Sequence, residues 1–254
     1  MKHLIFIVLT ILFIGCDADT SMEDLLMKDV EKVMLSKEGP TEFFYFELKD
    51  RPEIWASNPD NIAAIQSYRD SVQHQLGSSK YAQTVHKESV QDLDSDRLKN
   101  AVNGDSINAL LVHTGKIGSI RDMNFLESCL LNYQVSRFPL FSTPTEFHGF
   151  ILSHKKTGII RVYFGASDTE WPPQPRIILK ELTELDHNWK LIYHLHNHYC
   201  KEDGDYVGIL APSLADAQYF KMLKEQFSLE KAIITNGFHT VEIDSSDFEK
   251  FESH

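Results

Sequence analysis

The sequence is poor in cysteine and in positive charge. Three cysteines in 254 residues are too few for a disulfide scaffold. The 25 lysine and arginine residues are outnumbered by 37 aspartate and glutamate residues, which gives a formal net charge of −12. A protein that binds a nucleic-acid backbone needs a surplus of lysine and arginine, so this balance argues against nucleic acid as a partner.

The sequence also lacks internal repeats, low-complexity tracts and Gly/Ser-rich linkers. Its longest apolar run is shorter than the roughly 20 residues that a membrane-spanning helix needs. Apolar residues make up 42% of the chain and charged residues 24%, a composition that supports a sizeable core and argues against wholesale disorder. We therefore expect one large domain or two small ones.

The longest apolar run lies at the N-terminus, where residues 4–14 are apolar except for one threonine and follow a lysine. Its length is typical of the h-region of a signal peptide. Residues 13–16, Phe-Ile-Gly-Cys, resemble a bacterial lipobox, with phenylalanine where leucine is usual. The resemblance implies that residues 1–15 are removed and that a lipidated Cys16 anchors the protein to a membrane of the bacterial cell envelope, facing the periplasm or the exterior. A plain secretory signal and a short uncleaved anchor are the alternatives.

The other two cysteines, Cys129 and Cys200, have two possible states. They could pair in an oxidising envelope, or both could carry thiols. Their spacing does not decide between the two.

The hydrophobic pattern predicts helices and strands that are mixed without strict alternation. This is typical of an α+β (layered α/β) fold with a mixed β-sheet flanked by helices. In the N-terminal half we expect helices at 22–35 and 61–76, strands at 43–46 and 107–113, and a loop at 77–104. In the C-terminal half we expect helices at 123–135, 177–185 and 213–227, strands at 147–152, 158–164, 190–198, 231–235 and 240–243, and a polar loop at 199–210.

Three histidines alternate along the strand expected at 190–198. Side chains two residues apart share a face of a strand, so His196 and His198 project to the same side, and imidazole is a preferred ligand of Zn²⁺. His194 lies on that face too, so His194 and His196 are an alternative ligating pair. The opposite face of the strand is expected to belong to the core: Leu191, Tyr193 and Leu195.

Ser213 and Asp216 open the helix that follows Pro212. Ser213 is a good N-cap, and Asp216 three residues later makes a variant of the capping box, which by itself explains both residues. A carboxylate on the first turn of a helix can also ligate a metal. The structural and the metal-binding roles of Asp216 are therefore compatible.

Glu146, the His-x-His pair and the Ser-x-x-Asp pair occur in the order of the JAB/MPN (JAMM) zinc metalloprotease domain. Residues 144–151 resemble the Pro-x-Glu-x-x-Gly entry of that family, with isoleucine where leucine is common at the end. The His-Asn-His of residues 196–198 and the Pro-Ser-x-x-Asp of residues 212–216 are similar to the RadC branch. Two features depart from the pattern: Tyr199 stands where proline is usual, and the segment from Tyr199 to Pro212 is about twice the usual length.

The resemblance implies a JAB/MPN-like (cytidine-deaminase-like) core and a division of the chain into four parts: a signal peptide at 1–15, an N-terminal α+β region of unknown role at 16–120, a metallohydrolase domain at 121–245 and a C-terminal tail at 246–254. It also implies the site. His196, His198 and Asp216 would bind one Zn²⁺, Glu146 would act as general base and acid, and Ser213 would stabilise the oxyanion during hydrolysis of an amide bond in a peptide or protein.

Two further interpretations stay open. The chain could be a non-catalytic MPN-like module that binds a protein partner. It could also be a metal-binding envelope protein without hydrolysis, in which the histidines act together with Asp203 and Asp205. The sequence does not indicate the oligomeric state or the identity of the substrate.

Overall fold

The computed structural model describes these parts of the chain: residues 30–57, 63–82, 103–138, 145–169, 172–198, 201–202, 205–206 and 208–253.

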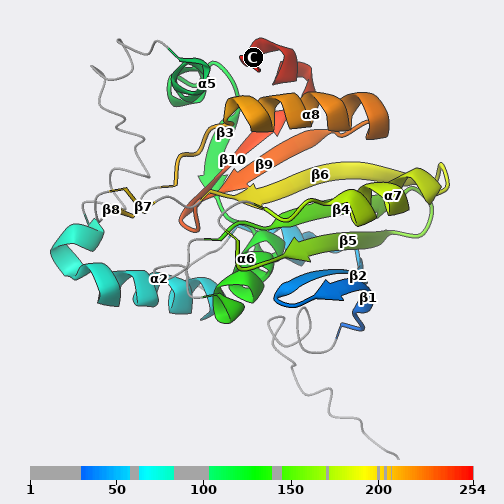
Figure 1. The fold of residues 1–254 in the computed structure, drawn as a ribbon, viewed down its shortest axis with the longest axis horizontal. Coiled ribbons are helices and arrows are strands. Elements are labelled where there is room, and N and C mark those ends of the chain that lie inside the picture. Colours follow the sequence, from blue (N-terminus) through cyan, green and yellow to red (C-terminus); the bar gives the residue numbers. More distant parts are fainter. Residues whose placement is uncertain are drawn as a thin grey trace, which may run out of the picture.

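An eight-stranded mixed sheet organises these residues (Figure 1). Its strands are β1 (Val33–Glu38), β2 (Thr41–Lys49), β3 (Ser119–Asp122), β4 (His148–His154), β5 (Ile159–Ala166), β6 (Trp189–Asn197), β9 (Lys231–Thr235) and β10 (His239–Asp244). The helices are α2 (Ala63–Leu76), α5 (Gly104–His113), α6 (Phe125–Arg137), α7 (Arg176–Glu184) and α8 (Leu214–Phe227), with short 3-10 helices η1 (Pro52–Trp55) and η3 (Ser245–Lys250). A separate two-stranded hairpin consists of β7 (Lys201–Glu202) and β8 (Asp205–Tyr206). The predicted α+β class with a mixed sheet flanked by helices is confirmed.

The strands are ordered β1-β2-β5-β4-β6-β9-β10-β3 across the sheet. Every neighbouring pair is antiparallel except β6 and β9, which run parallel. A parallel pair needs a crossover connection, and α8 provides it. The crossover brings the amino end of α8 to the carboxyl end of β6 (Figure 1).

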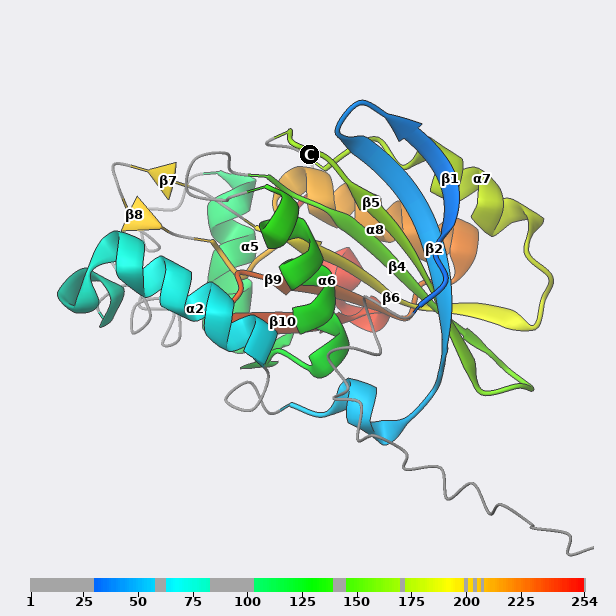
Figure 2. The same ribbon diagram turned by 90° about the horizontal axis from the view of Figure 1, so that it is seen from below.

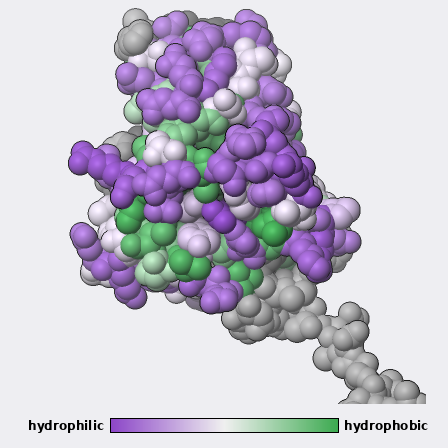
Figure 3. Space-filling model, turned by 90° about the vertical axis from the view of Figure 1, so that its right-hand side faces the viewer, coloured by the Kyte–Doolittle hydropathy of each residue, from purple (hydrophilic) through white to green (hydrophobic). Residues whose placement is uncertain are grey.

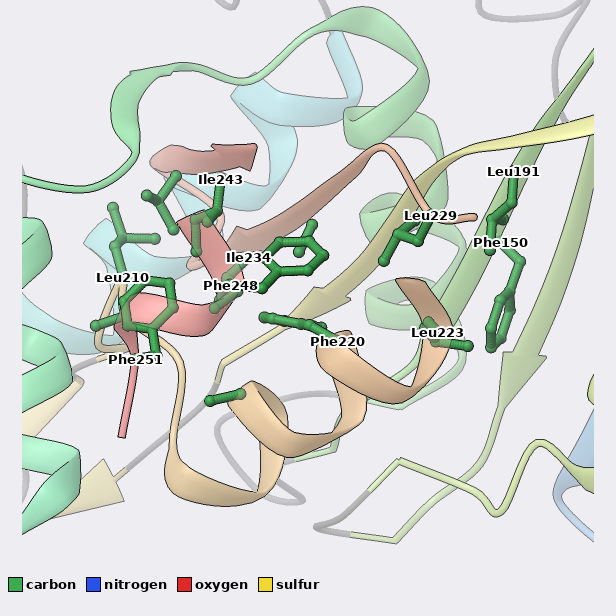
Figure 4. Close-up of a cluster of buried hydrophobic side chains, with 14 of the residues drawn as sticks. Phe150, Leu191, Leu210, Phe220, Leu223, Leu229, Ile234, Ile243, Phe248 and Phe251 are labelled. Atoms are coloured by element: carbon green, nitrogen blue, oxygen red, sulfur yellow. The ribbon is translucent and has the colours of Figure 1, made fainter. Parts of the chain in front are cut away.

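Helices cover both faces of the sheet. Seen from below, α6 crosses one face with α2 beside it, whereas α7 and α8 lie over the other face (Figure 2). Each face has its own apolar core: Leu126 and Leu130 of α6 pack against Leu195 of β6, while Phe220 and Leu223 of α8 pack on the other side. Figure 4 shows the second core, in which η3 closes the packing through a residue, Phe248, that is fully buried.

Strand β6 contains an irregularity that changes which face its residues occupy. The pairing of β6 with β4 skips Ile192, so the alternation of side chains shifts by one residue at that point. Leu195 therefore packs in the α6 core, and Leu191 packs in the α8 core. The expectation that Leu191, Tyr193 and Leu195 share one face is wrong for Leu191.

The first part of the chain also differs from expectation. Residues 33–35 begin β1 instead of ending a helix at 22–35, and residues 22–29 lie outside the described part. The reason is the tight turn between β1 and β2, where Gly39 adopts a positive φ of 61° that lets the two strands pair. Both strands join the same sheet as β4, β5, β6, β9 and β10, so the sheet extends across the boundary expected at residue 120.

Residues 107–113 form a helix, α5, and not the expected strand. The side chain of Asn103 caps this helix by accepting a hydrogen bond from Ser106 N at 2.9 Å. Ala109 and Val112, three residues apart, are buried on one face, which a short apolar run allows as readily as it allows a strand. Within the loop expected at 77–104, residues 78–82 are helical and residues 83–102 lie outside the described part.

The remaining predicted helices and strands are found within a few residues of their expected bounds, and β3, at one edge of the sheet, was not expected. Among the described residues, no helix is both long and apolar enough to cross a membrane. The visible surface in Figure 3 is mainly hydrophilic with smaller apolar areas. The large apolar side chains that are exposed in the described part are Val33, Met34, Ile107 and Ile209.

A buried carboxylate joins the β3 edge of the sheet to α6. Glu127 is 1% exposed, and its two oxygens accept hydrogen bonds from the Arg121 guanidinium at 2.6 and 3.0 Å. Thr240 of β10 donates a further bond at 3.1 Å, and Asn124 forms a capping box with Glu127 at the start of α6. Three elements thus share one buried ion pair.

Replacing Glu127 by alanine is expected to lower the free energy of unfolding by about 3 kcal/mol, because Arg121, Thr240 and the amino end of α6 lose the buried carboxylate that they share and Arg121 keeps only Glu242 as an acidic partner among the described residues. Urea unfolding followed by circular dichroism measures the change. The matched control is Glu249→Ala, which removes an ion pair between largely exposed groups and should cost less than about 1 kcal/mol. Equal losses in the two variants would contradict this account.

Candidate metal centre

Three potential ligands meet where the carboxyl end of β6 faces the amino end of α8. His196 lies in β6, His198 follows its last residue, and Asp216 lies in the first turn of α8. Each side chain offers one ligand atom, and the three atoms lie within 4.8 Å of one another. Residues 18 positions apart in the sequence meet because the β6–α8–β9 crossover folds α8 back over the sheet. The group could hold a metal ion.

The distances within the group fit a small cation. The Nε2 atoms of His196 and His198 are 3.0 Å apart, and Asp216 Oδ1 and Oδ2 lie 3.4 and 3.2 Å from them respectively. Ligands placed tetrahedrally at 2.0–2.2 Å from a zinc ion are separated by about 3.4 Å. Two ring nitrogens and the two oxygens of one carboxylate therefore lie close enough together to hold a metal ion.

The ring of His198 is held in the orientation that ligation requires. Its Nδ1 donates to the carbonyl oxygen of Ile209 at 2.7 Å, which leaves Nε2 as the ring atom that faces the group. Gly208 makes this contact possible, since a Cβ at this position would lie only 2.5 Å from the His198 carbonyl oxygen and 2.8 Å from Asn236 Cβ. The chain can therefore return past His198 only if residue 208 has no side chain.

Asp216 combines the two roles considered for it. The predicted capping box is confirmed: Ser213 Oγ accepts from Asp216 N at 3.1 Å, and Asp216 Oδ2 accepts from Ser213 N at 2.9 Å. The Ser213 hydroxyl also donates to Asp216 Oδ2 at 2.7 Å. Helix capping thus fixes the carboxylate beside the two histidines.

The electrostatics of the group keep the Asp216 carboxylate ionised. Burial alone would raise the pKa of Asp216, but the charges and hydrogen bonds of His196 and His198 outweigh it and hold this pKa well below its usual value. For His198, burial acts to lower the pKa, and the hydrogen bond and charge of Asp216, aided by the charge of Glu146, raise it above its usual value. A cation in the group would take the place of the proton shared by His198 and Asp216.

Glu146 lies two residues before β4, within electrostatic reach of His198. It is half-buried, whereas its neighbours Thr145 and Phe147 are fully buried. The sequence-based assignment of a general base to this position is therefore compatible with its place beside the ligands.

His194, the alternative ligand, is turned away from the group. It is fully buried, and its Nε2 faces Nδ1 of His148 at 2.9 Å. The group of potential ligands includes His198 and not His194. His148 was missed by the sequence reasoning, although it lies only two residues after Glu146. In the sheet it pairs directly with His196.

Several predicted residues cannot be placed. Cys16, Cys200 and Asp203 lie outside the described residues, as does the side chain of Asp205. Cys129 is a buried thiol in α6.

Comparison of the chain with protein-family models, with curated proteins and with solved structures found no match in any of the three.

The paired histidines behind the ligands make the protein sensitive to acid. Burial, with a smaller contribution from the charge of His196, lowers the pKa of His148 to about 3. Burial, together with the charges of His148 and His196, holds the pKa of His194 well below its usual value. Both rings therefore stay neutral in the folded protein at pH values where an unfolded chain binds protons.

We expect the metal-free protein to lose stability as the pH falls below about 6.5, by up to about 1.4 kcal/mol per pH unit for each of the two histidines. The contribution of each neutral histidine to stability is fully present above the ordinary histidine pKa. It is lost as the pH falls towards the lowered pKa that the histidine has in the folded protein. Urea unfolding in a chelating buffer between pH 7 and pH 4.5 measures the slope. His194→Leu fills the apolar surroundings of His194 without a titrating group and should reduce the slope by about half. An unchanged slope in this variant would contradict the explanation.

Proposed function

We propose that this protein is a zinc-dependent peptidase or isopeptidase of the JAB/MPN type, which hydrolyses an amide bond. The observation that supports the proposal is the convergence of His196, His198 and Asp216 within 4.8 Å, with Glu146 in electrostatic reach of His198. The four residues come from three separate segments of the chain. Their order along the chain is that of the JAB/MPN motif, which the sequence resembles.

The donor set favours zinc. Two imidazole nitrogens and one carboxylate oxygen are three protein ligands of the kind found in catalytic zinc sites, which leave the fourth position open. The hydrogen bond from His198 Nδ1 to Ile209 O is the outer contact that zinc-binding histidines usually make. When bound, zinc supplies Lewis acidity, which lowers the pKa of a coordinated water from 15.7 towards about 7.

Glu146 and Ser213 carry the remaining chemistry. Glu146 takes a proton from the attacking water as general base and delivers it to the leaving amine as general acid. Ser213 donates a hydrogen bond to the oxyanion that develops on the substrate carbonyl. Its hydroxyl donates to Asp216 at 2.7 Å in the present structure, so Ser213 must rotate about its Cα–Cβ bond to reach the substrate.

The alternative is a metal-binding or MPN-like module that binds a protein partner without hydrolysis. The capping box favours it, because helix capping explains Ser213 and Asp216 without any catalytic role. This alternative predicts a protein that binds metal but cleaves no amide bond.

The proposed substrate is a peptide or protein, and the proposed place of action is the bacterial cell envelope. The lipobox-like residues 13–16 support attachment to a membrane through Cys16. The acidic balance of the chain argues against nucleic acid as a partner.

The purified protein is expected to hold about one zinc per chain, with Glu146→Gln retaining the zinc and reducing amide hydrolysis by about 10²–10⁴-fold, because only the proton transfer is lost. Elemental analysis measures the metal, and mass spectrometry of a peptide library measures cleavage. Glu184→Gln, at an exposed position of α7, is the matched control and should change neither.

Three results would contradict the proposal or part of it. A metal-free protein with intact histidines would overturn it, and a protein that holds iron would overturn the choice of zinc. Undiminished cleavage by Glu146→Gln would remove the assigned general base.

Cys16→Ala is expected to move the protein from the membrane fraction to the aqueous fraction of cells that express the full sequence, because acyl chains attach through this thiol. Detergent partitioning followed by immunoblotting measures the change. Cys200→Ala, which leaves the lipobox-like segment intact, is the control. A membrane-bound Cys16→Ala protein would indicate an uncleaved anchor instead.

A further inference from the structure

The side chain of Asn197 binds the backbone on both sides of Glu146. Its Oδ1 accepts a hydrogen bond from Phe147 N at 2.9 Å, and its Nδ2 donates to Thr145 O at 2.9 Å. Asn197 is fully buried, and both of its polar groups are satisfied by these two contacts. One side chain of β6 thus holds the segment that carries Glu146.

The alternation of side chains explains the direction in which Glu146 points. Asn197 stands between His196 and His198, so its side chain leaves β6 on the face opposite to the ligands. Phe147 packs in the α6 core on that same face. Fixing the two neighbours of Glu146 towards α6 leaves the Glu146 side chain on the face of the ligands, where its charge acts on His198.

The strand pairings of β4 do not extend to the segment that carries Glu146. In the described residues, the pairing of β4 with β6 and with β5 begins at His148 in both cases. Residues 145–147 lie beyond that point, so side chains must fix them. Besides Asn197, Gln134 of α6 contributes through its Nε2, which donates to Thr145 Oγ1 at 2.8 Å.

We infer that Asn197 is a positioning residue that sets the place of Glu146 relative to the metal ligands on either side of Asn197. The inference rests on the proposed function, since it concerns the general base of that reaction. Residues 196–198 then supply two metal ligands and also the side chain that positions the general base. A purely structural role, in which Asn197 only satisfies two buried backbone groups, would change stability but not the electrostatics at the metal.

The test uses the cobalt-substituted protein, whose visible absorption bands change with pH. The midpoint of that change depends on the charge next to the metal. Glu146→Gln removes one negative charge and is expected to lower the pH midpoint of these bands by about one unit. Asn197→Ala should also lower the midpoint, by at least half as much. The cobalt affinity should change less than about threefold, because the Asn197 side chain lies on the face away from the ligands. Added to Glu146→Gln, Asn197→Ala should cause no further shift.

Two controls keep the result interpretable. Asn188→Ala makes the same change before the other end of β6, far from the ligands, and should leave the midpoint unchanged. If Asn197→Ala does not fold by circular dichroism, Asn197→Ser replaces it, because a serine side chain is too short to reach both Thr145 O and Phe147 N.

The outcomes separate the two proposals. A wild-type protein that binds no cobalt overturns the proposed function and this inference with it. A wild-type protein that binds cobalt, together with an Asn197→Ala midpoint equal to that of the wild type, overturns the inference alone. An equal shift of Asn197→Ala in the Glu146→Gln background also overturns it, because Asn197 would then act on the metal by a route other than Glu146.

Discussion

The parallel pairing of β6 with β9 is the constraint on which the rest of the site depends. All other neighbours in the eight-stranded sheet are antiparallel, but this one pair requires the chain to cross the face of the sheet before it returns. Helix α8 makes that crossing and begins beside the carboxyl end of β6. His196 and His198 at the end of the strand and Asp216 in the first turn of the helix are thereby brought within 4.8 Å. The carboxyl end of a parallel strand is where α/β sheets commonly bind ligands.

The same crossover buries polar side chains between the sheet and α8. His194 and His196 are almost completely buried between the sheet and α8, and Nδ1 of each lacks a hydrogen-bond partner among the described residues. The two Nε2 atoms of His196 and His198 face each other at 3.0 Å, so one of them must donate a proton unless a cation lies between them. The unpaired Nδ1 atoms lower the stability of the folded protein, whereas a cation bound between the Nε2 atoms would add to it, because such a cation would bind the folded state alone.

Much of the fold could be predicted because the patterns are local. The capping box of Ser213 and Asp216 spans four residues, and the helical and strand periods of α6, β4 and β5 are readable within ten or so residues. The failures also have a physical cause. The strand predicted at 107–113 is helix α5 because a short apolar run fits both periods, and β3 was missed because its four residues become a strand only by pairing with β10. The skipped residue Ile192 is equally invisible in the sequence, since it depends on the register with β4.

The sequence by itself determined the chemical types at the site and their local geometry: two histidines two residues apart on one face of a strand, and a carboxylate fixed by a helix cap. Tertiary structure decided which histidines belong to the group, because His194 is turned to His148 on the neighbouring strand. It also decided where Glu146 stands, through the contacts of Asn197 with a segment 50 residues earlier in the chain. Alternation and capping act over a few residues, whereas these contacts exist only after strands distant in the sequence have paired.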